Sequence, residues 1–126
     1  MAGTIVADTI QNGAGTSTSM TNAISGSAKA WVNFDGTTSP GTIRASYNVS
    51  SITKTATGDY VVNFTNAFAD ANYATVSSSG RNGSSGGYLS LVSDKTAQTT
   101  TTVQLYTITT SGTVIDTPYV SVAVFR

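Results

Sequence analysis

Residues 28–34 read AKAWVNF, and every second side chain along this stretch is apolar. Side chains alternate between the two faces of an extended strand, so the even-numbered residues up to Phe34 would share one face and Trp31 would lie on the other. Residues 119–126, YVSVAVFR, show the same period with valine at every second position. Both stretches therefore predict β-strands with one buried face.

The segment between these two stretches contains further strand patterns. Residues 43–49, IRASYNV, place Ile43, Ala45, Tyr47 and Val49 on one predicted face. A short connection with a glycine, residues 56–59, separates two alternating runs and is typical of a β-hairpin. Three more candidate strands follow, at residues 71–79, 88–93 and 99–110. We predict an all-β, antiparallel β-sandwich of about seven or eight strands.

The composition supports the same fold class. Charged residues make up 10% of the 126 residues, compared with about 25% in typical soluble domains. All six acidic residues are Asp, Leu occurs only three times, and Ser and Thr together number 40. Residues that form surface helices are thus scarce, while β-branched residues are abundant. A helical bundle, a coiled coil and an α/β architecture are disfavoured.

Residues 1–27 have a different character from the rest of the chain. They offer one candidate strand at residues 4–10, a run rich in Gly, Ser and Thr, and a weak helix signal over residues 21–30 that Gly26 interrupts. Such a segment has too few large apolar side chains to cover a core of its own. We predict an N-terminal attachment arm or linker at residues 1–27 and a β-sandwich domain at residues 28–126.

Charge and hydropathy exclude two kinds of partner. The net charge is +0 and only six Lys and Arg residues are present, so no basic patch is expected to gather phosphates and nucleic-acid binding is not predicted. No run of 18 apolar residues occurs, so no membrane insertion is predicted. We also see no basic and apolar leader of the export type at residues 1–13.

The inventory of reactive residues argues against an enzyme. The chain has no Cys and no His, which removes disulfides, thiolate nucleophiles and the commonest general base and metal ligand. Each Asp lies beside a turn signal or a strand end, where its side chain most often caps the local backbone. Without a His, no serine has the usual base that would activate it as a nucleophile, although a Ser–Lys pair stays open. We predict no catalytic residue, no cofactor and no metal ion.

Two places are candidates for receptor binding. Trp31, the only Trp, is either an aromatic platform for a sugar ring or a residue of the core or of a subunit interface. Residues 80–87, GRNGSSGG, form a glycine-rich loop in which Arg81 and Asn82, with Tyr88 after them, could recognise a ligand. The alternative for this loop is an inert connection.

Four blocks resemble, in the same order, the distal domains of bacteriophage tail fibres. They are KAWVNFDG at residues 29–36, IRASYNVSSITKTATGDYVVNF at residues 43–64, ANYA at residues 71–74 and YVSVAVFR at residues 119–126. The resemblance implies a homotrimeric β-domain, located on the virion, that contacts a glycan or protein of the host surface without acting as an enzyme. One departure is Ala69 before Asp70, where relatives commonly have proline.

The resemblance leaves more than one role on the virion open. Relatives usually end a much longer fibre, whereas 27 residues precede this domain, so we expect those residues to bind another virion protein. The first reading is a tail-fibre-like protein that mediates attachment to the host. The second is a capsid decoration or head-fibre protein built from the same β-module. A glycan depolymerase is disfavoured, because the chain has no Glu and no adjacent pair of acids.

Overall fold

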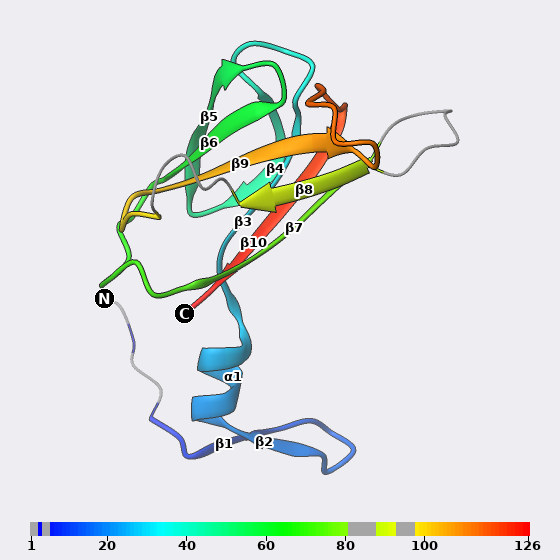
Figure 1. Ribbon diagram of the computed structural model, residues 1–126. Helices are drawn as coiled ribbons and strands as arrows, with labels where there is room; N and C mark the ends of the chain where they lie inside the picture. The colour runs from blue at the N-terminus through cyan, green and yellow to red at the C-terminus, as the bar shows by residue number, and fades with distance from the viewer. Residues whose placement is uncertain (1–2, 4–5, 81–87, 93–97) are drawn as a thin grey trace.

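The computed structural model describes residues 3, 6–80, 88–92 and 98–126, and in these residues it is mostly β-structure (Figure 1). Two four-stranded antiparallel sheets form the β-domain, with strand orders β4-β3-β10-β7 and β5-β6-β9-β8. The first sheet contains β3 (Ala28–Asp35), β4 (Thr42–Tyr47), β7 (Ala74–Gly80) and β10 (Tyr119–Phe125). The second contains β5 (Val49–Ala56), β6 (Asp59–Phe64), β8 (Tyr88–Val92) and β9 (Thr102–Thr109).

The two sheets share one hydrophobic core. Alternate residues of β3 and β10 point into it, as the sequence pattern predicted, and the central strands β6 and β9 of the other sheet supply the opposing side chains. The core consists of Ala30, Val32, Phe34, Val49, Ile52, Tyr60, Val62, Phe64, Tyr73, Val103, Leu105, Val120, Val122 and Val124. The all-β prediction and the β-sandwich character are therefore confirmed.

An aromatic contact joins the sheets near the centre of this core. The rings of Phe34 on β3 and Tyr60 on β6 meet edge to face, with centroids 5.2 Å apart, and both side chains are 0% exposed. This geometry suits the opposite charge of ring faces and ring edges. Gly36 makes room for the Tyr60 hydroxyl, which donates to the Gly36 carbonyl oxygen at 3.0 Å. A side chain at position 36 would collide with that hydroxyl.

Residues 43–49 do not form the single strand that their alternation predicted. In β4, Ala45 pairs with Asn33 and Ile43 pairs with Phe34, so Arg44 is an extra residue that forms a β-bulge. The bulge shifts the alternation by one residue, and Ala45 and Tyr47 consequently face solvent. The prediction that they share a face with Ile43 was wrong, because a period of two cannot register an inserted residue.

Asn48 turns the chain from the first sheet into the second. Its φ of 54° is the left-handed conformation that Asn tolerates better than most residues. The Asn48 side-chain oxygen accepts the Asn66 amide at 2.8 Å, and the Asn48 carbonyl oxygen accepts the Thr65 amide at 3.1 Å. Tyr47 and Val49 thus lie on different sheets although they are two residues apart.

The long strand predicted at residues 99–110 is shorter in the structure. Thr99 precedes the strand, and its hydroxyl accepts the backbone amides of Thr101 at 3.2 Å and Thr102 at 2.9 Å. These bonds form a local turn that competes with β-pairing, as threonine hydroxyls often do. The strand β9 accordingly begins at Thr102.

Asp116 fastens the β5–β6 hairpin to the segment that leads into β10. Its carboxylate accepts hydrogen bonds from Lys54 Nζ at 2.7 Å, the Gly58 amide at 2.7 Å and the Tyr60 hydroxyl at 3.0 Å. Gly58 has a φ of 63°, and its amide is brought to Asp116 by this left-handed turn. Burial raises the pKa of Asp116, but the hydrogen bonds from Lys54, Gly58 and Tyr60 outweigh it and hold the pKa below its usual value.

The N-terminal segment projects from the β-domain (Figure 1). It forms a hairpin of β1 (Thr9–Gln11) and β2 (Ser17–Ser19), followed by helix α1 (Met20–Gly26). Ser19 caps the helix by accepting the Asn22 amide at 3.1 Å, and the helix ends at Gly26 rather than continuing to Ala30. Of the strand predicted at residues 4–10, Thr9 and Ile10 belong to β1 and residues 6–8 do not, while Thr4 and Ile5 lie outside the described residues.

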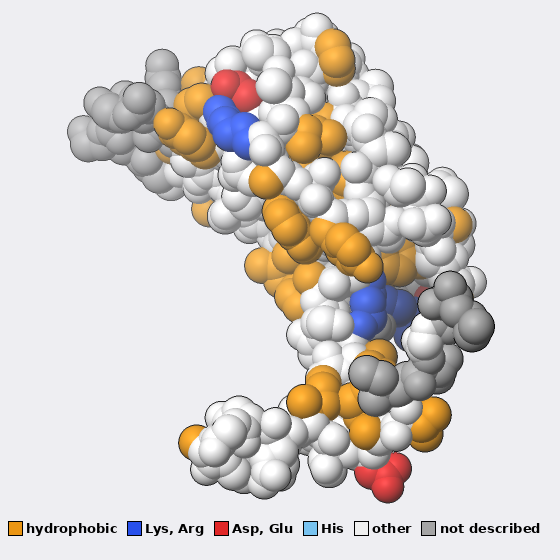
Figure 2. Space-filling model, turned by 180° about the vertical axis from the view of Figure 1, so that it is seen from behind, with side chains coloured by type: hydrophobic (Ala, Val, Ile, Leu, Met, Phe, Trp, Pro, Cys, Tyr) orange, Lys and Arg blue, Asp and Glu red, His pale blue; other side chains and the backbone are white. Residues whose placement is uncertain are grey.

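Three apolar side chains of this segment are exposed. Val6 is 92% exposed, Ile24 57% and Ile10 48%, and no residue of α1 is buried. Seen from behind in Figure 2, the segment curves away from the β-domain and leaves a hollow side between the two. Exposed apolar groups of this kind are stabilised when another surface covers them.

The shared core predicts a large loss of stability for Phe34→Ala. We expect the free energy of unfolding to fall by about 3–5 kcal/mol, because the substitution removes a fully buried ring and leaves a cavity. Phe34→Leu should cost about 1–2 kcal/mol, which keeps the test usable if the alanine variant does not fold. Urea unfolding followed by circular dichroism measures both. The matched control is Val76→Ala on an exposed face, for which we expect less than about 1 kcal/mol; an equal loss there would contradict the assignment of the core.

Asp116→Asn should destabilise the protein by about 1–3 kcal/mol at neutral pH, because it removes the charge that pairs with Lys54. The pKa of Asp116 is lowered in the folded state, so its contribution is present above its ordinary pKa and is lost as the pH falls through the folded-state value. The difference between wild type and variant should hence be constant above about pH 5 and shrink toward about pH 2.

Unfolding curves at several pH values measure this difference. Asp70→Asn is the control, since that exposed carboxylate pairs with Arg126 at the surface and its loss should leave stability close to wild type. A difference for Asp116→Asn that grows at low pH would refute the stabilising role of the carboxylate.

Candidate functional site

The outer face of the first sheet carries a row of apolar side chains that crosses all four strands. Trp31 pairs with Tyr47 on one side and with Ala123 on the other, and Ala123 pairs in turn with Val76. Paired residues of neighbouring strands lie on the same face of a sheet, so these four form one continuous row. Tyr47 is 58% exposed, Trp31 41% and Val76 62%. We call Tyr47, Trp31, Ala123 and Val76 the apolar row.

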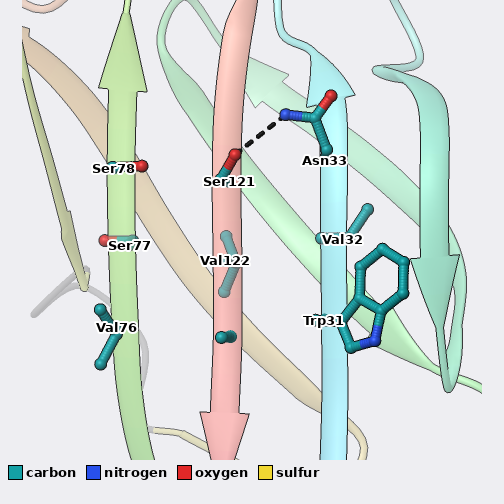
Figure 3. A pocket seen from close by; sticks show the side chains of 9 residues that line it. Trp31, Val32, Asn33, Val76, Ser77, Ser78, Ser121 and Val122 are labelled. Carbon is teal, nitrogen blue, oxygen red and sulfur yellow. Dashed lines mark hydrogen bonds between the residues drawn. The ribbon is translucent and has the colours of Figure 1, made fainter. Parts of the chain in front are cut away.

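A second row lies two residues further along each strand. It consists of Ala45, Asn33, Ser121 and Ser78, which pair in that order across the sheet. The Asn33 side-chain amide donates to the Ser121 hydroxyl at 2.9 Å, so the two side chains hold each other in place (Figure 3). We call the last three of these residues, Asn33, Ser121 and Ser78, the polar row. At about 3.4 Å per residue it lies about 7 Å from the apolar row.

An open groove of about 280 Å³ lies over these rows. Strands β3, β10 and β7 line it, with Trp31 and Val76 on its two sides and the small side chain of Ala123 between them. In Figure 3 the indole ring of Trp31 extends from β3 toward β4, and Asn33 and Ser121 lie at the other end of the groove. None of the nine lining residues is charged.

Charged groups lie on this face on both sides of the two rows. Lys29, two residues before Trp31 on β3, donates to the Ile24 carbonyl oxygen and the Ser27 hydroxyl, and an ion pair lies beyond the polar row. Arg44, the bulge residue, binds the Asp35 carboxylate at 2.9 Å and lies 4.9 Å from the centre of the Tyr119 ring. Hydrogen bonds from Thr37 to Asp35, together with the charge of Arg44, hold the pKa of Asp35 below its usual value. The groove is thus bordered by an ion pair beyond the polar row and by Lys29 beyond the apolar row.

The structure places the predicted receptor-binding residues in different regions. Trp31 lies outside the core on an exposed face, so the reading of Trp31 as a core residue was wrong, while the sugar-platform and subunit-interface readings remain. Tyr88 begins β8 in the other sheet and is half-buried. Arg81 and Asn82 lie outside the described residues. Of the two that the structure describes, Trp31 lines the groove and Tyr88 does not.

Sequence reasoning missed the other residues of the groove. Val76 and Ala123 were assigned to strands, but their place beside Trp31 depends on the pairing register, which no local pattern contains. Tyr47 was predicted to share a face with Ile43 because the bulge at Arg44 was not foreseen. The alternation of β3 did correctly predict that Trp31 and Asn33 share a face.

The described carboxylates of the β-domain have structural partners. Asp35 and Asp70 accept the amides of Thr37 at 2.9 Å and Asn72 at 2.8 Å, which is the local capping expected from the sequence. Asp59 accepts the Gln104 amide at 2.7 Å. Within the described residues, no three acidic or other metal-ligating side chains gather in one place. In the same part of the chain, no helix has the length and hydropathy needed to cross a membrane.

Comparisons with known proteins give no relative for this chain. No family model matches it, and neither a curated protein nor a solved structure is significantly similar. The fold and the site themselves define the class of protein: it is a β-sandwich-like domain with a partly aromatic groove on one outer face, and no residue that lines this groove is charged.

The exposed position of Trp31 predicts that Trp31→Ala costs only about 1 kcal/mol of stability, because the lost ring does not belong to the core. This value is well below the about 3–5 kcal/mol typical of a buried Trp. Urea unfolding measures it, with Phe34→Ala as the buried comparison. A loss as large as that of Phe34→Ala would show that the ring is covered in solution.

Proposed function

We propose that this protein is a structural and binding component of a bacteriophage virion. In this proposal it is tail-fibre-like, assembles as a homotrimer, sits on the exterior of the virion and attaches to a glycan or protein of the bacterial surface. Residues 28–126 form the β-domain that meets the host, and residues 1–27 form the arm that binds another virion protein.

The position of the resembling blocks supports the proposal. Residues 29–36 fall on β3, residues 43–64 on β4 to β6 and residues 119–126 on β10. These strands supply most of the core, so the similarity concerns the residues that determine the fold rather than loops. This agreement is the observation that carries the proposal.

The exposed apolar groups of the arm support an attachment role for it. Val6, Ile10 and Ile24 are exposed on a segment that projects from the domain, and burying them against a partner would be favourable. A closed trimer also suits a small domain, which covers only about two-thirds of its unfolded surface when alone.

A binding role rather than catalysis is supported by the chemistry of the described residues. The acids of the β-domain that the structure describes are held by hydrogen bonds or ion pairs: Asp35 and Arg44, Asp59 and Gln104, Asp70 and Arg126, Asp116 and Lys54. A glycosidase needs two carboxylates facing a substrate in different environments. These acids serve the scaffold instead.

The trimer is tested by light scattering on purified full-length protein at micromolar concentration. We expect a mass near three times the 12.9 kDa of one chain. The variant Ile24→Asn, on the arm, should weaken the assembly if arms of neighbouring copies pack together, whereas Thr18→Asn on the same arm should not. A monomeric mass for the wild type would contradict the trimer.

Location on the virion is tested by labelling intact particles with antibodies against the β-domain and imaging them by electron microscopy. Signal at the tip of the tail is the expected result. Signal over the head would instead support the capsid-decoration alternative, and absence from purified virions would refute both.

A further inference from the structure

The groove on the outer face of the first sheet combines two kinds of surface. The apolar row presents an exposed indole beside aliphatic side chains, and the polar row presents an amide and hydroxyls about 7 Å away. Both rows lie on strands whose opposite face is the core, so the scaffold fixes their spacing.

We propose that this groove binds a neutral saccharide, with one sugar ring over Ala123, between Trp31 and Val76. A sugar ring has an apolar face of C–H groups and a rim of hydroxyls. The C–H face would pack on the apolar row, and the hydroxyls would bond to Asn33, Ser121 and Ser78. The inference deepens the proposed function and rests on it for the origin of the sugar, a glycan of the host surface.

The hydrogen-bonding capacity of the polar row fits such a ligand. An asparagine side chain can make several hydrogen bonds, and within the described residues Asn33 uses its amide for one, to Ser121. That bond orients Asn33 and leaves its carbonyl oxygen available as an acceptor for a sugar hydroxyl. Ser78 is exposed at the β7 side of the groove, where its hydroxyl can donate or accept.

The electrostatics favour an uncharged ring. No lining residue is charged, and the nearest ion pair, Arg44 with Asp35, is neutral as a unit. A phosphate, a sulfate or an acidic sugar would meet no cation among the lining residues, and Lys29, the cation next to Trp31 on β3, already donates to the Ile24 carbonyl oxygen and the Ser27 hydroxyl. A neutral sugar needs no such partner. The small Ala123 leaves the floor open, since any larger side chain there would occupy the space over β10.

The single Trp makes the test direct, because fluorescence excited at a wavelength that tyrosine does not absorb reports on Trp31 alone. Full-length protein is titrated with maltotriose, cellotriose and chitotriose as neutral probes and with heparin as a charged one. We expect a saturable change of emission with at least one neutral probe, with a Kd of about 1 mM or tighter, and none with heparin at the same ionic strength.

Two variants locate the binding. Ala123→Leu fills the floor of the groove, and we expect it to weaken binding at least ~10-fold, the effect of losing about 1.4 kcal/mol. Asn33→Ala should weaken it ~5-fold or more, because one oriented amide is lost. Both keep Trp31 and its fluorescence. Leu89→Ala, an exposed side chain on the other sheet, is the matched control and should bind as wild type does.

Three results would overturn the proposal: no saturable change with any neutral probe, a response to heparin alone, or unaltered binding by Ala123→Leu.

Acrylamide quenching of Trp31 fluorescence in the unliganded protein gives a fourth result that would overturn it. If Trp31 is shielded in the assembled protein and becomes accessible on dilution, a second copy occupies the groove. Light scattering and virion labelling do not depend on the groove, so the proposed function can hold while the sugar site fails.

Discussion

The rest of the structure depends on the contact between the inner faces of the two four-stranded sheets. Phe34 and Tyr60 meet at its centre, and the valines of β10 fill the space beside them. Apolar area removed from water at this contact is the main favourable contribution that so small a chain can gain. The side chains on the inner face of each strand must be apolar to form the core. The side chains on the outer face are not constrained by the core and can differ in polarity and size.

The outer face of the first sheet illustrates this division. Trp31 and Asn33 alternate with the buried residues of β3, and the pairing with β10 places Ala123 and Ser121 beside them. The groove therefore has its shape because the sheet holds its register, and the register is held by the core. Asp116 and Asn48 contribute in a different way, by fixing the hairpin and the corner that connect the sheets.

Much of the fold could be predicted from the sequence, since period-two alternation identifies the buried face of β3 and β10 directly. Residues 43–49 could not be predicted in the same way. The bulge at Arg44 and the left-handed turn at Asn48 interrupt the period, and both depend on partners distant in sequence. Of the candidate site, Trp31 and its face were predictable. Its neighbours Tyr47, Ala123 and Val76 were not, because the register between strands is a tertiary property.

The bulge in β4 has a consequence for how such a surface can change over generations. One inserted residue, Arg44, moves Tyr47 from the core side of its strand to solvent while the pairing on both sides of it continues. Deleting Arg44 would remove the bulge, so that the side chains after it that now face solvent would face the core, and those that now face the core would face solvent. Single-codon insertions and deletions in an edge strand thereby offer a route to new surfaces that leaves the central strands of both sheets untouched.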